Sequence, residues 1–192
     1  MEVKGKKIGF VITGSFSMFR KVIKQMKKLK KLGDDIIPIM SENSYILDTR
    51  DGKSEDYINE IEEICEKKII HTLYDAENIG LKHLIDIMIV APASGNTISK
   101  LACDIIDTSA TMAVKSHLRN NMPVVIAPST NNGLGDNLIN IGKLINRRNY
   151  YFVPFRQDNP ITKPYSIVFD SEYIVRTIEF ALDKEQISPI IL

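Results

Sequence analysis

Two short runs of the sequence are almost entirely apolar, and they limit the possible folds more than any other feature. The runs are Ile8–Ile12 and Ile85–Val90. Strands that are covered on one face alternate apolar with polar residues, whereas parallel strands that are buried on both faces are apolar throughout. The two runs therefore predict a mostly parallel β-sheet that lies between two layers of helices.

The rest of the chain alternates apolar runs with amphipathic stretches, which is typical of a doubly wound, Rossmann-like α/β fold. We expect strands, in chain order, at Lys7–Ile12, Ile36–Met40, Lys68–Thr72, Leu84–Ala91, Pro123–Ala127 and Tyr150–Pro154. We expect helices at Ser17–Leu32, Ser54–Glu66, Ser94–Cys103, Thr108–Asn120, Leu134–Arg147 and Ser171–Lys184. Because crossovers between parallel strands are right-handed, we expect the strand order 3-2-1-4-5-6 in one domain over residues 1–192. The stretches Ser41–Lys53 and Phe155–Asp170 are predicted to be long irregular loops.

The charges of the chain are balanced, with 25 Lys and Arg residues against 24 Asp and Glu residues. A net charge of +1 predicts no strong long-range attraction to nucleic acid or to a membrane. The most basic stretch, Arg20–Lys31, carries its apolar residues at helical spacing, which favours a solvated helix face over a site for a polyanion.

The two cysteines, Cys65 and Cys103, have no metal-ligand spacing, so we expect no metal site and a reducing compartment. No segment reaches the roughly 20 apolar residues that cross a bilayer. Residues 1–5 lead directly into an expected strand rather than resembling a signal sequence. These features favour a cytoplasmic protein.

Ligands of an open parallel sheet bind at the carboxyl ends of its strands. The first expected strand is followed by Thr13-Gly14-Ser15, whose hydroxyls and free amides can hold an anion at a helix start. The full GxGxxG and P-loop spacings are absent, and a plain helix cap at Ser15 or Ser17 explains the run equally well. We therefore take these residues as candidates only.

Ser41 follows the second expected strand, where an NAD enzyme would usually place an acidic residue for the ribose. Glu42 is one position further on, so NAD is not excluded by this feature. A serine suits a contact to phosphate, and we favour a mononucleotide.

Small polar residues also follow the fourth and fifth expected strands. In the first group, Gly95 would let the backbone approach a flat ring, and the neighbouring side chains offer donors: Ser94, Asn96 and Thr97. The alternative is a helix cap with Thr97 at its third position. In the second group, turn chemistry explains Asn132-Gly133 but not the adjacent Asn131. We predict a ligand site where these loops meet.

The runs 13–15 and 92–102 resemble the flavoprotein superfamily that includes phosphopantothenoylcysteine decarboxylases, lantibiotic cysteine decarboxylases and flavin prenyltransferases. Those proteins bind FMN, and the resemblance implies that its phosphate is approached by Gly14, Ser15 and Ser41. It implies that the ring is approached by Ser94, Gly95, Asn96 and Thr97. Asn131 corresponds to the polar loop on the substrate side. Members form trimers or dodecamers, which implies a homo-oligomer.

A narrower resemblance covers nearly the whole chain. The segments that carry it are Asp48–Lys53, Ser129–Gly135 and Tyr151–Pro160, with Lys163-Pro164 and Ser166 following, and they resemble the family of dipicolinate synthase B subunits. In that family the B subunit works with an A subunit, which resembles an NAD(P)-dependent dehydrogenase, to make dipicolinate during endospore formation. The resemblance implies an oxidoreductase subunit that helps to oxidise dihydrodipicolinate.

Arg50 and Arg156 lie in two of these segments. A guanidinium can hold a carboxylate through two parallel hydrogen bonds, so we predict that both arginines bind the dicarboxylate substrate. The alternative is that each forms a weak surface ion pair with a neighbour, Asp48 or Asp51 for Arg50 and Asp158 for Arg156.

The chain departs from the decarboxylases where they carry a histidine, because it has Glu77–Gly80 there and His83 is displaced. Their PxMN-type loop is replaced by Pro128–Asn131, and His71 and His117 are interpreted as structural. No residues form a convincing acid, base or nucleophile arrangement, so the catalytic residues are unassigned. Two alternatives stay open: an independent FMN-dependent decarboxylase or prenyltransferase, and a non-catalytic scaffold or regulatory subunit.

Overall fold

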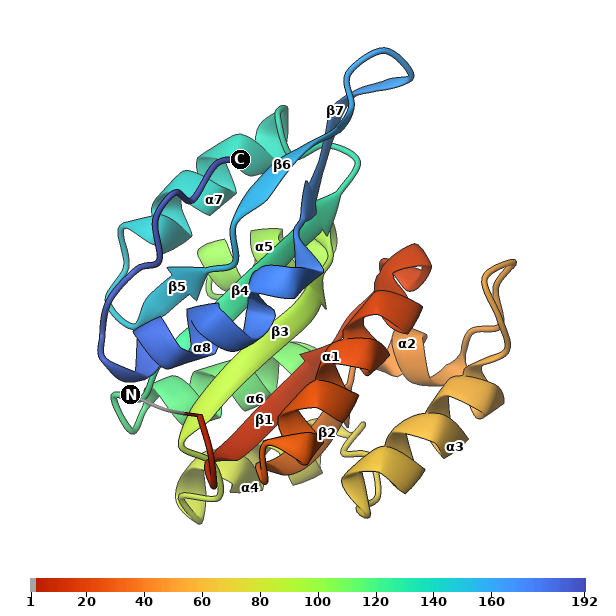
Figure 1. Cartoon of the computed structure of the whole chain (residues 1–192), viewed down its shortest axis with the longest axis vertical. Helices are drawn as coiled ribbons and strands as arrows, with labels where there is room; N and C mark the ends of the chain where they lie inside the picture. Colours follow the sequence, from red (N-terminus) through yellow and green to blue (C-terminus); the bar gives the residue numbers. More distant parts are fainter. Residues whose placement is uncertain (1–2) are drawn as a thin grey trace.

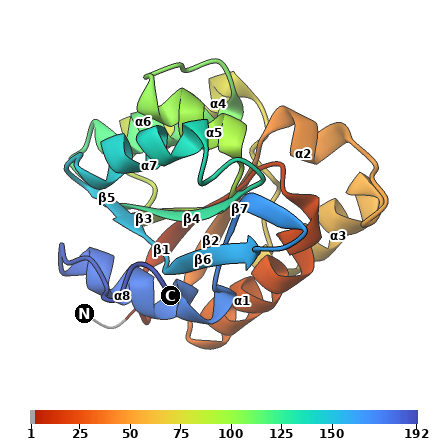
Figure 2. The same cartoon turned by 90° about the horizontal axis from the view of Figure 1, so that it is seen from above.

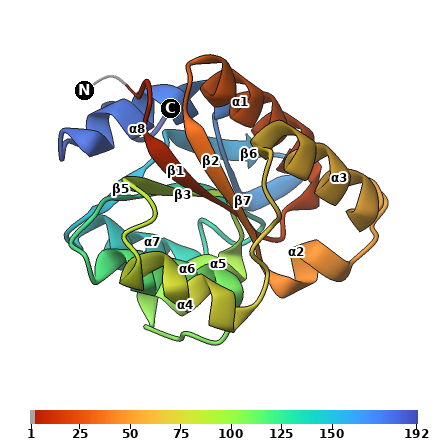
Figure 3. The same cartoon turned by 90° about the horizontal axis from the view of Figure 1, so that it is seen from below.

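A sheet of seven strands runs through the centre of the molecule, with helices on both faces (Figures 1 and 2). The structure is a computed structural model and describes residues 3–192, so residues 1 and 2 of the expected N-terminal lead lie outside it. One face is covered by α4, α5, α6 and α7, and the other by α1, α3 and α8 (Figure 3). The predicted doubly wound α/β architecture is confirmed.

The sheet combines a parallel part with an antiparallel hairpin. The parallel strands are β2 (Asp35–Met40), β1 (Lys7–Ile12), β3 (Ile87–Ala93), β4 (Val124–Thr130) and β5 (Tyr150–Phe152). The hairpin strands are β6 (Phe155–Asn159) and β7 (Lys163–Phe169). Strand β5 pairs with the first half of β4, while β7 pairs with its last residues, Ser129 and Thr130. The hairpin replaces most of the irregular loop predicted over 155–170, and that prediction was wrong.

The strand predicted at Lys68–Thr72 is reduced to one parallel bridge between Ile70 and Ile39. This bridge lies beside β2, as the predicted strand order 3-2-1-4-5-6 requires for the third strand. The ladder cannot extend towards Lys68 because Pro38 of β2 has no N–H to donate. In the other direction the ladder ends because the chain turns at Thr72, which caps α4.

The predicted helices all form, with ends that differ by a few residues: α1 (Phe19–Lys31, after a 3-10 turn at Phe16–Met18), α3 (Ser54–Cys65), α5 (Gly95–Ala102), α6 (Ser109–Leu118), α7 (Asp136–Ile145) and α8 (Ile174–Leu182, after a 3-10 turn at Ser171–Tyr173). Two further helices were not predicted, α2 (Glu42–Ile46) and α4 (Leu73–Leu81). Thr72 caps α4 by accepting a hydrogen bond from the Asp75 amide at 3.1 Å. This Thr-x-x-Asp pattern is the signal that sequence reasoning missed.

The core lies on both faces of the parallel strands. All seven residues of β3 are buried, as the apolar run predicted. On α1 the apolar residues face the core, while Lys27, Lys28 and Lys30 form ion pairs at the surface, which confirms the solvated basic face. Cys65 is buried, and burial raises the pKa of its thiol to about 12, so the thiol stays protonated. Within residues 3–192 no helix is long and apolar enough to span a membrane.

His117 on α6 is 1% exposed, and its Nε2 lies 3.1 Å from the carbonyl oxygen of Pro123. Burial lowers the pKa of this histidine from 6.5 to about 4. Between these two pH values the unfolded chain binds a proton that the folded chain does not bind. We therefore expect His117 to make the free energy of unfolding fall as the pH falls from 6.5 to 4, by at most about 1.4 kcal/mol per pH unit.

Urea denaturation at several pH values within this window measures the effect. The His117→Gln variant keeps an amide that can donate to Pro123 but does not titrate, so its stability should depend less on pH than that of the unmodified protein. Carboxylates contribute equally to both proteins, and the difference between them isolates the histidine. Equal pH dependence in the two proteins would show that His117 titrates normally in the folded state.

Candidate functional site

A cleft of about 860 Å³ opens at the carboxyl ends of β1, β3 and β4, and residues of the β6–β7 hairpin form part of its lining. Its size is within the roughly 300–1,000 Å³ of small-molecule sites. Six regions line it: residues 14–18 after β1 with Lys21 of α1, residues 50–51 between α2 and α3, residues 95, 96 and 99 of α5, residues 129–132 at the end of β4, Asn137 of α7, and the hairpin. The cleft lies where the sequence predicted that the strand-end loops would meet.

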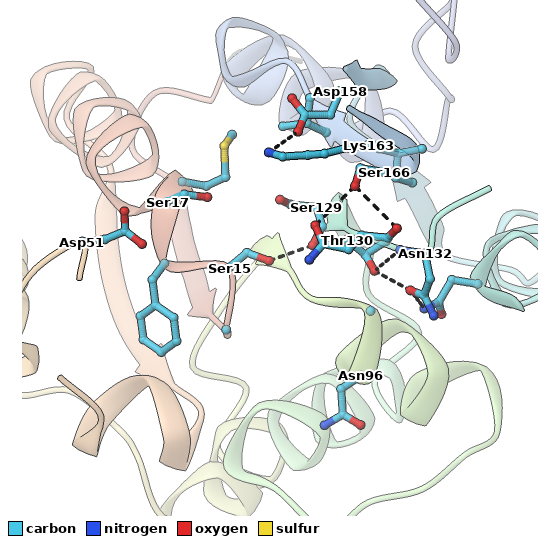
Figure 4. A pocket seen from close by; sticks show the side chains of 18 of the residues that line it. Ser15, Ser17, Asp51, Asn96, Ser129, Thr130, Asn132, Asp158, Lys163 and Ser166 are labelled. Carbon is cyan, nitrogen blue, oxygen red and sulfur yellow. Dashed lines mark hydrogen bonds and ion pairs between the residues drawn. The ribbon is translucent and has the colours of Figure 1, made fainter. Parts of the chain in front are cut away.

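Two hydroxyl side chains tie these loops together. Thr13 Oγ1 donates to the Pro92 carbonyl oxygen at 2.8 Å and accepts from the Ser94 amide at 3.0 Å. Ser15 Oγ donates to the Ser129 carbonyl oxygen at 2.7 Å (Figure 4). Ser15 therefore links the loop after β1 to β4 and does not cap the following turn with its side chain. Within residues 3–192 the amides of Gly14 and Ser15 donate no hydrogen bond, so both remain available to an anion.

The start of α5 divides the predicted ring contacts into two groups. Ser94 caps the helix, with its Oγ accepting from the Thr97 amide at 3.3 Å and lying 3.0 Å from Thr97 Oγ1. The helix cap that the sequence offered as an alternative is therefore present. The side chains of Ser94 and Thr97 do not line the cleft. Asn96 is exposed and lines the cleft, and its side chain has no partner among residues 3–192. Figure 4 shows it at the end of the cleft opposite Lys163.

Gly95 also lines the cleft, and the structure gives a reason for glycine there. A Cβ at this position would collide with Thr130 Oγ1 and would lie 2.8 Å from Asn137 Nδ2 and 3.0 Å from Asn132 Oδ1. The glycine is therefore required for close contact between α5 and the loop after β4. Sequence reasoning assigned its small size to the approach of a ring instead.

Ser41 does not line the cleft. It is 8% exposed at the start of α2, and its Oγ lies 2.9 Å from Ser44 Oγ. The next residue, Glu42, accepts a hydrogen bond from the Ser109 amide at 2.7 Å, so this carboxylate stabilises the start of α6. The contact of Ser41 with phosphate stays a prediction. The present position of its hydroxyl, beside Ser44 and outside the cleft lining, does not support that contact.

The hairpin brings charged side chains over the cleft. Arg156 forms an ion pair with Asp170 at 3.3 Å, and not with Asp158 as the alternative proposed. Asp158 instead pairs with Lys163 at 2.9 Å (Figure 4). Arg50 has no hydrogen bond or ion pair to its guanidinium within the described chain, residues 3–192, so its alternative pairing is not formed.

The contacts of Asp48 explain why it does not pair with Arg50. Asp48, one of the expected partners of Arg50, instead accepts hydrogen bonds from the Ser54 amide at 2.8 Å and the Ser54 hydroxyl at 3.0 Å. The hydrogen bond from the Ser54 amide is the main reason that the pKa of this carboxyl group is lowered. On the other wall, Ser166 Oγ lies 3.3 Å from Asn131 Oδ1 and orients that amide. The lining residues missed by sequence reasoning include Phe16, Lys21 and Lys163. Of these, Lys163 is among the residues that carry the narrower family resemblance, which is the signal that could have assigned it to the site.

The cleft is richer in basic than in acidic side chains. Its lining contains Lys21, Arg50, Arg156 and Lys163 on the basic side, against Asp51 and Asp158. This excess favours an anionic ligand. Among the described residues that line the cleft, we find no acid and base pair beyond those considered from the sequence.

The histidines lie elsewhere. His71 stacks on Tyr45 with ring centroids 3.7 Å apart, His83 is exposed after α4, and His117 is in the core. No group of three His, Cys, Asp or Glu residues in 3–192 could hold a metal ion. The cleft can therefore bind and orient an anion, but its own side chains form no nucleophile and base pair.

Comparison with known proteins agrees with the resemblances that the motifs predict. The sequence profile described as Flavoprotein matches residues 1–170. The B subunit of dipicolinate synthase from Bacillus subtilis (strain 168) is 38% identical over 190 residues, which cover 99% of this chain and 95% of the relative. The crystal structure of the dipicolinate synthase B subunit from Bacillus halodurans has a TM-score of 0.91 at 41% identity, covering 100% of this chain and 98% of that one. The FMN-dependent cysteine decarboxylase SpaF shares the fold, with a TM-score of 0.71 at 19% identity over 95% of this chain and 98% of its own.

Proposed function

This chain belongs to the flavoprotein family, and from that premise we propose that it is the B subunit of a dipicolinate synthase. In this role it helps to oxidise dihydrodipicolinate, a cyclic dicarboxylate, to dipicolinate during spore formation. One observation carries the proposal. The three segments of the narrower family resemblance, which contain Arg50, Asn131 and Arg156, are far apart in the sequence but meet in one basic cleft.

FMN is the proposed cofactor, and the residues of the cleft fit it. The free amides of Gly14 and Ser15 suit its phosphate, as does the neighbouring hydroxyl of Ser17, which has no partner within residues 3–192. The side chain of Asn96 offers unpaired donors and an acceptor to the edge of a flavin ring. FMN supplies electron and hydride transfer when it is bound. The protein supplies binding, orientation and the basic wall for the substrate.

The proposed substrate site includes Arg50 and Arg156, which both line the cleft. An A subunit that carries NAD(P) is the proposed partner. We also propose that the chain forms a homo-oligomer, as the family resemblance implies, and that it is cytoplasmic, as its composition implies. An independent decarboxylase is disfavoured because none of the three histidines lines the cleft. A scaffold or regulatory subunit is the second candidate, favoured by the lack of a nucleophile and base pair among the lining residues.

Isothermal titration calorimetry with FMN tests the cofactor assignment. We expect the unmodified protein to bind FMN and Asn96→Leu to bind it about tenfold more weakly, because a hydrogen bond worth about 1 kcal/mol is lost and a polar contact becomes apolar. Asn43→Leu is the matched control, since Asn43 is exposed at the same second position of α2 but lies outside the cleft. Absence of FMN affinity in the unmodified protein would refute the cofactor proposal.

A further inference from the structure

A buried amide forms part of the wall of the cleft. Asn137, in the first turn of α7, is 2% exposed. Its Nδ2 donates to Asn132 Oδ1 at 2.6 Å, and its Oδ1 lies 2.8 Å from Ser99 Oγ and accepts from Asn140 Nδ2 at 3.1 Å. One side chain therefore connects α7 to both α5 and the loop after β4.

The loop after β4 takes its shape from these contacts. Asn132 Oδ1 also accepts from Thr130 Oγ1 at 2.7 Å (Figure 4). The Asn132 carbonyl oxygen accepts from the amides of Gly135 at 3.1 Å and Asn137 at 3.3 Å. The adjacent Asn131 faces the cleft. A change at Asn137 would therefore be transmitted to the loop at both the side chain and the backbone of Asn132.

The start of α5 is held against the same group of side chains. Ser99 Oγ lies 2.9 Å from the Gly95 carbonyl oxygen as well as 2.8 Å from Asn137 Oδ1. A Cβ added to Gly95 would lie 2.8 Å from Asn137 Nδ2, so no space separates the helix start from the amide. Asn137 thus lies between the two segments that present Asn96 and Asn131 to the cleft.

We propose that Asn137 is a positioning residue that sets the separation between the start of α5 and the Thr130–Asn132 loop, and thereby the fit of the cleft to its cofactor. The inference deepens the proposed function and rests on it where FMN is concerned. The buried side chain is that of Asn137, and removing its amide takes one hydrogen-bond partner away from Asn132 Oδ1 and one from Ser99 Oγ. Asn137 itself does not have to touch the cofactor in order to act.

The test uses Asn137→Leu, which keeps the same branched side-chain skeleton but makes no hydrogen bonds. We expect its dissociation constant for FMN to rise about tenfold and the visible absorption bands of the bound flavin to shift, because the ring is held differently. Asn146→Leu is the matched control. Asn146 ends the same helix and donates to the Gly142 carbonyl oxygen at 2.7 Å, so its loss weakens α7 without changing the cleft. An unchanged affinity and spectrum in Asn137→Leu would overturn the inference.

A second readout does not need FMN. Amide hydrogen exchange of residues 94–97 and 130–132 should become about tenfold faster in Asn137→Leu than in the unmodified protein, and should not change in Asn146→Leu. If the unmodified protein binds no FMN, the cofactor proposal fails, and exchange alone decides whether Asn137 positions the loops. If Asn137→Leu does not fold, Ser99→Ala removes one hydroxyl only and should show the same pattern at about threefold. Unchanged exchange in the variant that folds would overturn the positioning role.

Discussion

Replacing Gly80 with alanine is expected to lower the free energy of unfolding by about 3 kcal/mol. Gly80 is buried on α4, where its amide donates to Ser116 Oγ of α6 at 3.0 Å. An added Cβ would collide with the Ser116 carbonyl oxygen and would lie 2.5 Å from Ser116 Oγ. A backbone carbonyl cannot rotate away as a side chain can, so the two helices would have to separate.

Gly142→Ala is the matched control, because Gly142 is also within a helix, α7, but an added Cβ there meets no atom within 4 Å. Alanine is the better helix former, so this variant should gain roughly 0.5–1 kcal/mol. In a chain of this size, thermal unfolding should then shift by roughly 6 to 12 °C downwards for Gly80→Ala and by a few degrees upwards for Gly142→Ala. A loss below about 1 kcal/mol for Gly80→Ala would mean that α4 and α6 move apart easily.

Strands β1 and β3 could be predicted because burial on both faces leaves a continuous apolar run in one stretch of sequence. Pairing partners leave no such local signal. Lys68–Thr72 has the composition of a strand, but its ladder is stopped by Pro38, which is distant in sequence, and by the start of α4 at Thr72. The β6–β7 hairpin was missed for a similar reason. Most of β6 is polar and exposed, and β7 is fixed by its pairing with the end of β4.

The position of the candidate site could also be predicted, because parallel strands place their carboxyl ends at one edge of the sheet. The individual contacts were harder to predict. Ser94 and Thr97 satisfy each other as a helix cap, and Ser41 turns towards Ser44, so hydroxyls in the expected loops do not all face the cleft. The reason for Gly95 lies in Thr130, Asn132 and Asn137, whose approach depends on tertiary packing. Local sequence identifies the loops but not the direction of each side chain.

The arginines of the cleft give the second large effect. We expect Arg50→Ala to lower kcat/KM for dipicolinate formation about thirty- to a hundredfold, since loss of a bidentate contact to a carboxylate costs about 2 to 3 kcal/mol. The guanidinium of Arg50 has no ion pair within residues 3–192, so its whole donor set is available to the substrate. Arg156 uses one nitrogen for Asp170 and keeps others free, and we expect a loss of the same order for Arg156→Ala.

The measurement is dipicolinate formation by variants of this chain reconstituted with an A subunit and its nicotinamide cofactor. Arg148→Ala is the control for lost charge, because Arg148 is exposed and lies outside the cleft. Asp170→Asn is the control for the ion pair, since it removes the charge that Arg156 contacts but keeps an oxygen for the Glu172 amide at 3.0 Å.

These controls separate two roles of Arg156. If Arg156 only supports the hairpin, Asp170→Asn should reproduce the loss seen in Arg156→Ala, because each variant breaks the same exposed ion pair, worth about 0 to 1 kcal/mol. If Arg156 binds the dicarboxylate, Asp170→Asn should stay close to the unmodified rate while Arg156→Ala does not. Unchanged rates in both arginine variants, with the complex still assembled, would remove the arginines from the substrate site. That outcome would favour a scaffold role for this chain.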